Sequence, residues 1–106
     1  MTAEEKKIIQ MIRKTGREVV PPDGQLWLYG SRARGDAHEE SDWDLLILLN
    51  KPKLEESDYN ITYPFWELGW KINAMIHPTV YTMNDWVKKC SPIFKSNVES
   101  EGLVIC

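Results

Sequence analysis

The residues best suited to chemistry lie in one short stretch of the chain, between Gly30 and Asp44. Gly30-Ser31 ends one apolar run, and Asp42 and Asp44 open the next one. Because successive side chains of a strand point to opposite faces, the two aspartates should share one face, with Trp43 on the other. Two carboxylates placed in this way can hold a hard divalent cation such as Mg²⁺. The spacing therefore predicts a metal site where the second apolar run begins.

The turn ahead of these acids has the features of a phosphate site. Gly30 has no Cβ to block close approach of a ligand, and Ser31 offers a hydroxyl and a backbone N–H at a helix start. Arg32 and Arg34 follow and can neutralise phosphate charge. Each residue also has a structural interpretation: Gly30 could simply end a strand, Ser31 could cap the helix, and the arginines could lie in solvent. Together with the acids, the turn indicates a site for a nucleoside triphosphate and its metal ion.

This pattern resembles the signature of a known family. Gly30-Ser31, ten intervening residues and then Asp42-x-Asp44 are similar to the DNA polymerase beta superfamily of nucleotidyltransferases, in its minimal single-domain form. The resemblance is carried by residues 26–49 and implies an α+β fold, a small mixed β-sheet with helices packed on it. It implies that Asp42 and Asp44 are catalytic and bind Mg²⁺. It also implies a nucleotide-binding set made of Gly30, Ser31, Arg32 and Arg34.

The chain departs from the family pattern on the expected third strand. The family usually places a third metal-binding carboxylate there, but residues 71–77 contain none, and we expect Asn73 or Ala74 at that position. An amide oxygen can bind a metal weakly, whereas alanine cannot. Glu67 is the nearest acid in sequence, but we expect it on the preceding helix. His77 is interpreted as a partly exposed strand residue rather than a catalytic one, because no partner for it is evident in the sequence.

A helix and a strand are expected to lead into the site. Thr2-x-x-Glu5 is typical of a capping box and Gly16 is typical of a helix end, which predicts a helix over residues 3–15. The first strand is expected over residues 25–30.

The second half of the chain is predicted to alternate helices and strands. We expect a helix over 57–71, with Pro64 marking its first turn or a kink, and a face formed by Ile61, Phe65, Leu68 and Ile72. Pro78 should place the third strand, over 74–81, at a sheet edge or a bulge. Two short helices follow, one capped by Thr82 and extending to Lys89 and one from Ser91-Pro92 to near Gly102. Residues 103–105 could form a small strand or a docking tail.

Composition limits the classes of protein that remain. A chain of 106 residues with 42% apolar content favours one domain, 1–106. A net charge of −3 disfavours general nucleic-acid binding, and no apolar run approaches the roughly 20 residues of a membrane span. Cys90 and Cys106 lack metal-ligand spacing, and with no secretory segment ahead of them we expect a reduced, cytoplasmic protein.

Two functions from different classes follow. The first is a Mg²⁺-dependent enzyme that moves a nucleotide, AMP from ATP, to an acceptor such as a partner protein. The second is a catalytically weak or inactive module that keeps the nucleotidyltransferase shape and acts by holding a partner. In the family that this chain resembles, that partner is often a small helical HEPN-type protein that the nucleotidyltransferase neutralises as an antitoxin.

Overall fold

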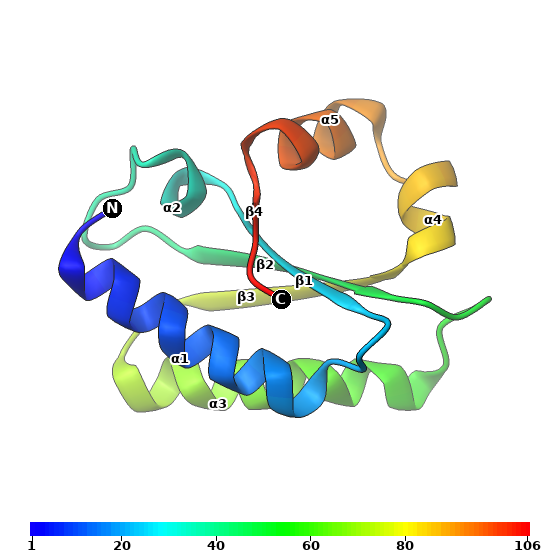
Figure 1. Ribbon diagram of the computed structural model, residues 1–106, viewed down its shortest axis with the longest axis horizontal. Coiled ribbons are helices and arrows are strands. Elements are labelled where there is room, and N and C mark those ends of the chain that lie inside the picture. The colour runs from blue at the N-terminus through cyan, green and yellow to red at the C-terminus, as the bar shows by residue number, and fades with distance from the viewer.

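The computed structural model describes residues 1–106 and consists of a four-stranded sheet with helices on both faces (Figure 1). The strand order is β3-β2-β1-β4. Strand β2 (Trp43–Leu49) pairs antiparallel with β1 (Gln25–Tyr29) and parallel with β3 (Ile76–Thr82), and β4 (Leu103–Val104) pairs antiparallel with β1. This arrangement confirms the predicted α+β fold with a small mixed sheet.

Helix α1 (Ala3–Val19) begins at the predicted capping box but does not end at Gly16. The Thr2 hydroxyl accepts a hydrogen bond from the Glu5 backbone N–H at 3.0 Å, and the Glu5 carboxylate accepts one from the Thr2 N–H at 2.9 Å. The predicted end at residue 15 is wrong because Gly16 is a packing residue. A Cβ at Gly16 would lie 2.6 Å from the Leu26 side chain. Glycine costs a helix about 1 kcal/mol, and close packing on the sheet offsets that cost here.

The helix expected over 57–71 is divided into two segments. A 3₁₀ helix, η1 (Glu56–Thr62), leads directly into α3 (Tyr63–Ile72), with Pro64 in the first turn of α3. Proline lacks the N–H that would continue a preceding helix, so it is accommodated at this junction. Asn73 ends α3 in a left-handed conformation with φ of 56°. Strand β3 consequently starts at Ile76 rather than at residue 74.

The last third of the chain follows the prediction closely. Strand β3 lies at the sheet edge, which is one of the two positions, edge or bulge, predicted from Pro78. Helix α4 (Met83–Lys88) is capped by Thr82, whose hydroxyl accepts from the Asp85 N–H at 3.0 Å. Helix α5 (Pro92–Glu101) precedes β4, so the small terminal strand, rather than a docking tail, is the structure of residues 103–104.

The two faces of the sheet carry separate cores. Figure 1 shows α1 and α3 on one side of the sheet, and α4 and α5 on the other with the short helix α2 (Ser31–Arg34). The larger core lies under α1 and α3 and includes Trp43, Leu45, Ile47 and Leu49 of β2. The smaller core joins Leu46 and Leu48 of β2 to α4 and α5. Those two helices cover only the later part of β2, so Asp44 near its start stays partly exposed. None of the helices has the length and apolar character needed to cross a membrane.

Candidate functional site

Asp42 and Asp44 project from the same face at the start of β2, as the strand period predicted. Trp43 points to the opposite face, where only 1% of it is exposed in the larger core. Asp44 is aligned with Tyr29 of β1 on one side and with His77 of β3 on the other. The sheet register therefore fixes the neighbours of Asp44 on both adjoining strands.

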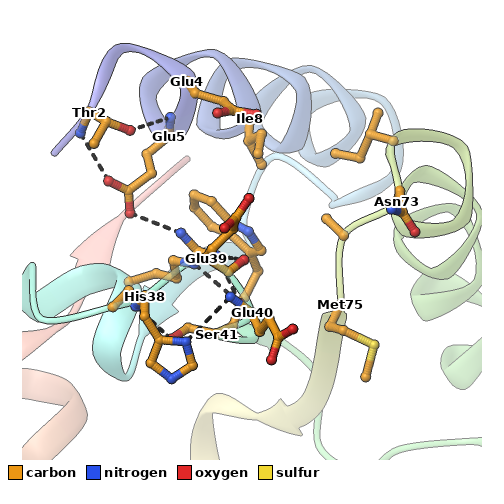
Figure 2. Close-up of a pocket in the computed structure, with 15 residues that line it drawn as sticks. Thr2, Glu4, Glu5, Ile8, His38, Glu39, Glu40, Ser41, Asn73 and Met75 are labelled. Atoms are coloured by element: carbon orange, nitrogen blue, oxygen red, sulfur yellow. Dashed lines mark hydrogen bonds and ion pairs between the residues drawn. The ribbon is translucent and has the colours of Figure 1, made fainter.

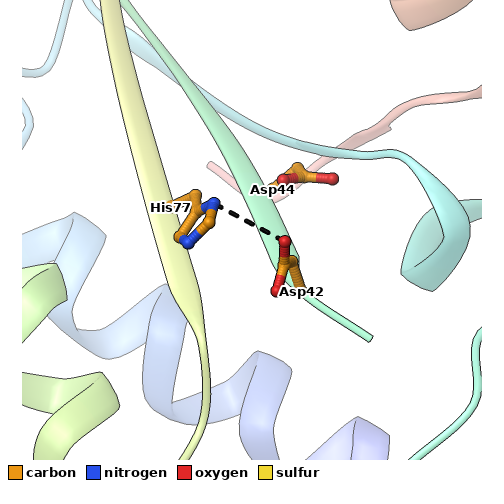
Figure 3. A group of neighbouring side chains, drawn as sticks. All are labelled: Asp42, Asp44 and His77. Carbon is orange, nitrogen blue, oxygen red and sulfur yellow. Dashed lines mark ion pairs between the residues drawn. The ribbon is translucent and has the colours of Figure 1, made fainter. Parts of the chain in front are cut away.

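His77 completes a cluster with the two aspartates, and Figure 3 shows its ring directed toward Asp42. The His77 Nδ1 lies 3.6 Å from the Asp42 Oδ2. One ligand atom from each of Asp42, Asp44 and His77 can be chosen so that all three lie within 4.8 Å of one another. The Trp66 ring packs beside the His77 ring, with 5.7 Å between centroids. His77 is thus partly exposed, as predicted, but it does have carboxylate neighbours.

Our placement of the third-ligand position at Asn73 or Ala74 is wrong. Asn73 ends α3, and both residues line a cavity to which neither aspartate contributes. Glu67 is exposed on α3 and is not part of the cluster. The error came from starting the third strand two residues early. Once β3 begins at Ile76, its parallel register with β2 places His77 beside Asp44.

The electrostatics of the cluster disfavour two bare carboxylates. Burial raises the pKa of Asp44 above its ordinary value, and the negative charge of Asp42 raises it further. His77 and Arg34 act in the opposite direction. A positive charge between the aspartates would oppose both effects that raise this pKa.

The turn at Gly30 packs directly against Asp44. Gly30 has φ of 77° and ψ of −161°, a conformation essentially restricted to glycine. A Cβ at this position would lie 2.5 Å from the Asp44 Oδ2. Gly30 is also the N-cap of α2, and no side chain caps that helix. The interpretation of Ser31 as a helix cap is therefore not what the structure shows, and Ser31 follows Gly30 as the first residue of α2.

Arg32 is a buried structural residue. Its Nη1 lies 3.2 Å from the Glu5 carboxylate, and its Nε and Nη2 donate to the Ser41 carbonyl at 3.2 and 3.0 Å. A further bond from Nη2 reaches the Glu39 carbonyl at 3.2 Å. The guanidinium also lies over the Trp43 ring, 4.7 Å from its centroid. All three guanidinium nitrogens thus have protein partners, which argues against the predicted nucleotide-binding role of Arg32.

These contacts of Arg32 border a cavity separate from the aspartate cluster. The cavity has a volume of about 910 Å³ and lies between the start of α1, the loop 37–41 and residues 72–75. Figure 2 shows Thr2 and Glu5 on one side of it and Glu39 and Ser41 on the other. Asp42, Asp44 and His77 do not line it. The structural arginine therefore lines a cavity to which the candidate metal ligands do not contribute.

Sequence comparison decides the family. The family described as "Nucleotidyltransferase domain" matches residues 6–104. The chain belongs to the nucleotidyltransferase domain family. The match extends the predicted resemblance, which rested on residues 26–49, to almost the whole chain. No curated protein matches the sequence.

Two solved structures with the same fold are described as toxin–antitoxin pairs. A crystal structure described as a toxin–antitoxin with AMP-PNP matches this nucleotidyltransferase domain with a TM-score of 0.65 and 17% identity, covering 92% of this chain and 72% of that chain. A crystal structure of the toxin–antitoxin MntA-HepT matches with a TM-score of 0.60 and 14% identity, covering 95% and 71%. At these identities the likeness establishes the fold.

The donor set of this nucleotidyltransferase domain fits a divalent cation. Asp42 and Asp44 supply carboxylate oxygens and His77 supplies a ring nitrogen. Asp44 and His77 lie on adjacent strands of one sheet, and Asp42 directly precedes the first residue of β2. Backbone pairing holds these strands in place, so the ligands are brought together before any ion binds. Partial burial and the neighbouring charge of Asp42 raise the pKa of Asp44, and a bound cation would act against both effects.

Arg34 is the arginine on the cluster side of the turn. It is exposed, and its two ion pairs are long and solvent-accessible, 3.3 Å from Asp36 and 3.4 Å from Glu101. Such exposed pairs contribute little to stability, so an anionic ligand could displace them. Its charge also acts on Asp44. Of the two predicted arginines, only Arg34 is both exposed and close enough to influence the cluster.

Proposed function

We propose that this nucleotidyltransferase domain binds ATP with a divalent cation, Mg²⁺ in the simplest case, and transfers AMP to an acceptor. The observation that carries the proposal is the position of Asp42 and Asp44 on one face of β2 against the Gly30 turn. The family match and the AMP-PNP described for a similar structure support a nucleotide as the ligand. A cytoplasmic location accords with this substrate and remains part of the proposal.

Each residue of the site has a distinct role in this proposal. Asp42 and Asp44 hold the cation, which supplies charge compensation for the triphosphate. Gly30 lets the turn lie against Asp44, and Ser31 offers its hydroxyl to a phosphate oxygen. Arg34 exchanges its exposed ion pairs with Asp36 and Glu101 for contacts with the triphosphate, whose charge it neutralises. The residues align the reactants, and positioning supplies most of what such a transfer requires from a protein.

The transfer forms a bond between an acceptor oxygen and the α-phosphorus and breaks the bond from that phosphorus to the β-phosphate oxygen. Pyrophosphate leaves, and the acceptor proton passes to solvent. We propose a partner protein as the acceptor, because two structures with this fold are described as toxin–antitoxin pairs. A small helical HEPN-type protein is the partner we expect.

The reaction can be tested with ATP labelled separately at the α- and γ-phosphates. The chain, co-purified with its partner and supplied with a divalent cation, should place the α-label on the partner and release the γ-label as pyrophosphate. Omitting the cation should abolish labelling. Labelling of the partner from the γ-phosphate instead would show phosphoryl transfer and contradict the proposal.

A second candidate function is a binding module that neutralises its partner by contact. It is favoured by the aromatic stripe, a set of exposed aromatic side chains on η1 and α3. These residues are spaced four, three and four apart, which places them on one helical face. The stripe consists of Tyr59, Tyr63, Trp66 and Trp70. It reaches the candidate site, because Trp66 packs beside His77.

The stripe is suited to a protein interface. Trp70 is 67% exposed and Tyr63 is 56% exposed, and their rings meet edge to face at 6.1 Å. Exposed aromatic side chains in a patch are typical of contact surfaces, where they supply large apolar area at low entropic cost. A toxin-type protein docked here would lie next to the aspartate cluster, so the same surface serves either function.

We expect Trp70→Ala to weaken partner binding by roughly 30-fold, because a tryptophan at the centre of an interface contributes about 2 kcal/mol. Ile93→Ala provides a matched control, since Ile93 is 74% exposed on α5, away from the stripe. Binding is measured by calorimetry with the purified partner. Equal weakening by both variants, or by neither, would place the partner elsewhere. Tight binding that survives loss of both aspartates, without any nucleotide transfer by wild type, would favour the binding module.

A further inference from the structure

We infer that His77 is the third metal ligand and gives the site a preference for nitrogen-accepting first-row cations such as Co²⁺ over Mg²⁺. The inference rests on the proposed cation site at Asp42 and Asp44 and adds to it the identity of the third donor. It assigns the site a mixed carboxylate and imidazole character, in place of an all-carboxylate one.

The backbone holds His77 in the position of a ligand. Asp44 and His77 are aligned partners in the parallel pairing of β2 and β3, so their side chains leave the same face of the sheet. Trp43 and Ile76, the residues just before them, are also aligned and are both buried in the opposite core. If the register of β3 shifted by one residue, His77 would enter the larger core and Ile76 would leave it. The apolar cores on the two faces of the sheet disfavour such a shift.

The distances are close to those that a shared cation requires. Two ligand atoms at about 2.1 Å from one octahedral ion lie about 3.0 Å apart when adjacent and about 4.2 Å apart when opposite. The Asp42 Oδ2 and the His77 Nδ1 are 3.6 Å apart, between these limits. The full set of three atoms lies within 4.8 Å, so small side-chain rotations suffice. The centroids of the Trp66 and His77 rings lie 5.7 Å apart, so the Trp66 ring restricts the side-chain conformations available to His77.

Ligand chemistry then sets the preference. Mg²⁺ binds oxygen donors and keeps much of its water, whereas imidazole suits first-row transition ions and binds Co²⁺ more strongly than the early members of the series. Replacing a carboxylate by an imidazole therefore shifts the relative affinities of the site away from Mg²⁺ and toward Co²⁺. Both ions accept six-coordinate sites, so the comparison reports on the donor atom.

The test compares Co²⁺ and Mg²⁺ binding to wild type and to His77→Asp by calorimetry. We expect His77→Asp to gain more affinity for Mg²⁺ than for Co²⁺, changing the ratio of the two dissociation constants by roughly tenfold or more. The NMR spectrum of the Co²⁺ form should show strongly shifted imidazole protons that disappear in His77→Asp. Far-UV circular dichroism confirms folding, and His77→Asn serves as a second variant if His77→Asp fails to fold.

The chain offers a matched control, because His38 is its only other histidine. His38→Ala should leave both the cation ratio and the shifted protons unchanged. An unchanged ratio in the two His77 variants, or shifted protons that depend on His38, would overturn the inference while leaving the aspartate site intact. Binding of both ions by a variant that lacks both aspartates would instead overturn the proposed function.

Discussion

Asp42→Asn combined with Asp44→Asn should abolish cation-dependent ATP binding and reduce nucleotide transfer by roughly a thousandfold or more, because both formal charges at the cation site are lost. The fold should survive. Asn has nearly the same shape as Asp, and the change removes the charge of Asp42 that acts on partly buried Asp44. The thermal unfolding midpoint should therefore equal or exceed that of wild type, and the loss of binding cannot be attributed to unfolding.

Calorimetry with ATP, with and without Mg²⁺, measures this effect directly. Glu67→Gln is the matched control, since it removes one exposed acid from α3 outside the cluster. We expect Glu67→Gln to bind ATP as wild type does. Equal Mg²⁺-dependent ATP affinity in wild type and the double variant would show that the aspartates do not hold the cation. Loss of affinity in Glu67→Gln would show that Glu67 reaches the metal after all.

Arg32→Ala should lower the free energy of unfolding by about 2–4 kcal/mol, because it removes one member of a largely buried ion pair and the donors to two loop carbonyls. The Glu5 carboxylate would keep only its contacts within the capping box. The packing of the guanidinium over Trp43 would also be lost. For a domain of this size the melting temperature should fall by roughly 10 °C or more.

Arg34→Ala is the control for this second prediction. Its ion pairs are exposed, so the urea unfolding midpoint of Arg34→Ala should stay close to that of wild type. At a temperature where both variants are folded, Arg34→Ala should bind ATP more weakly than wild type does. Arg32→Ala should bind ATP about as tightly as wild type. Urea unfolding and calorimetry separate the two effects. An Arg32→Ala protein with wild-type stability and impaired ATP binding would restore the role that the sequence predicted for Arg32.

The sequence by itself determined the parts of this protein that depend on local geometry. Alternation along a strand sufficed to place Asp42 and Asp44 together and Trp43 opposite. The start of α1 and the cap of α4 followed from hydrogen bonds that span three residues. Pro78 restricted β3 to a sheet edge or a bulge, because a missing N–H is a property of the residue itself, and the strand lies at an edge.

Only the tertiary structure decided which distant residues meet. His77 joined the aspartates because β3 pairs in parallel with β2 in one register, and that register depends on where α3 ends. Arg32 became a structural residue because the start of α1 brings Glu5 to it across 27 positions of sequence. Gly16 stayed inside α1 because Leu26 leaves no room for a side chain there. Each outcome is a contact between segments far apart in the chain, and neither residue type nor local spacing carries information about such a contact.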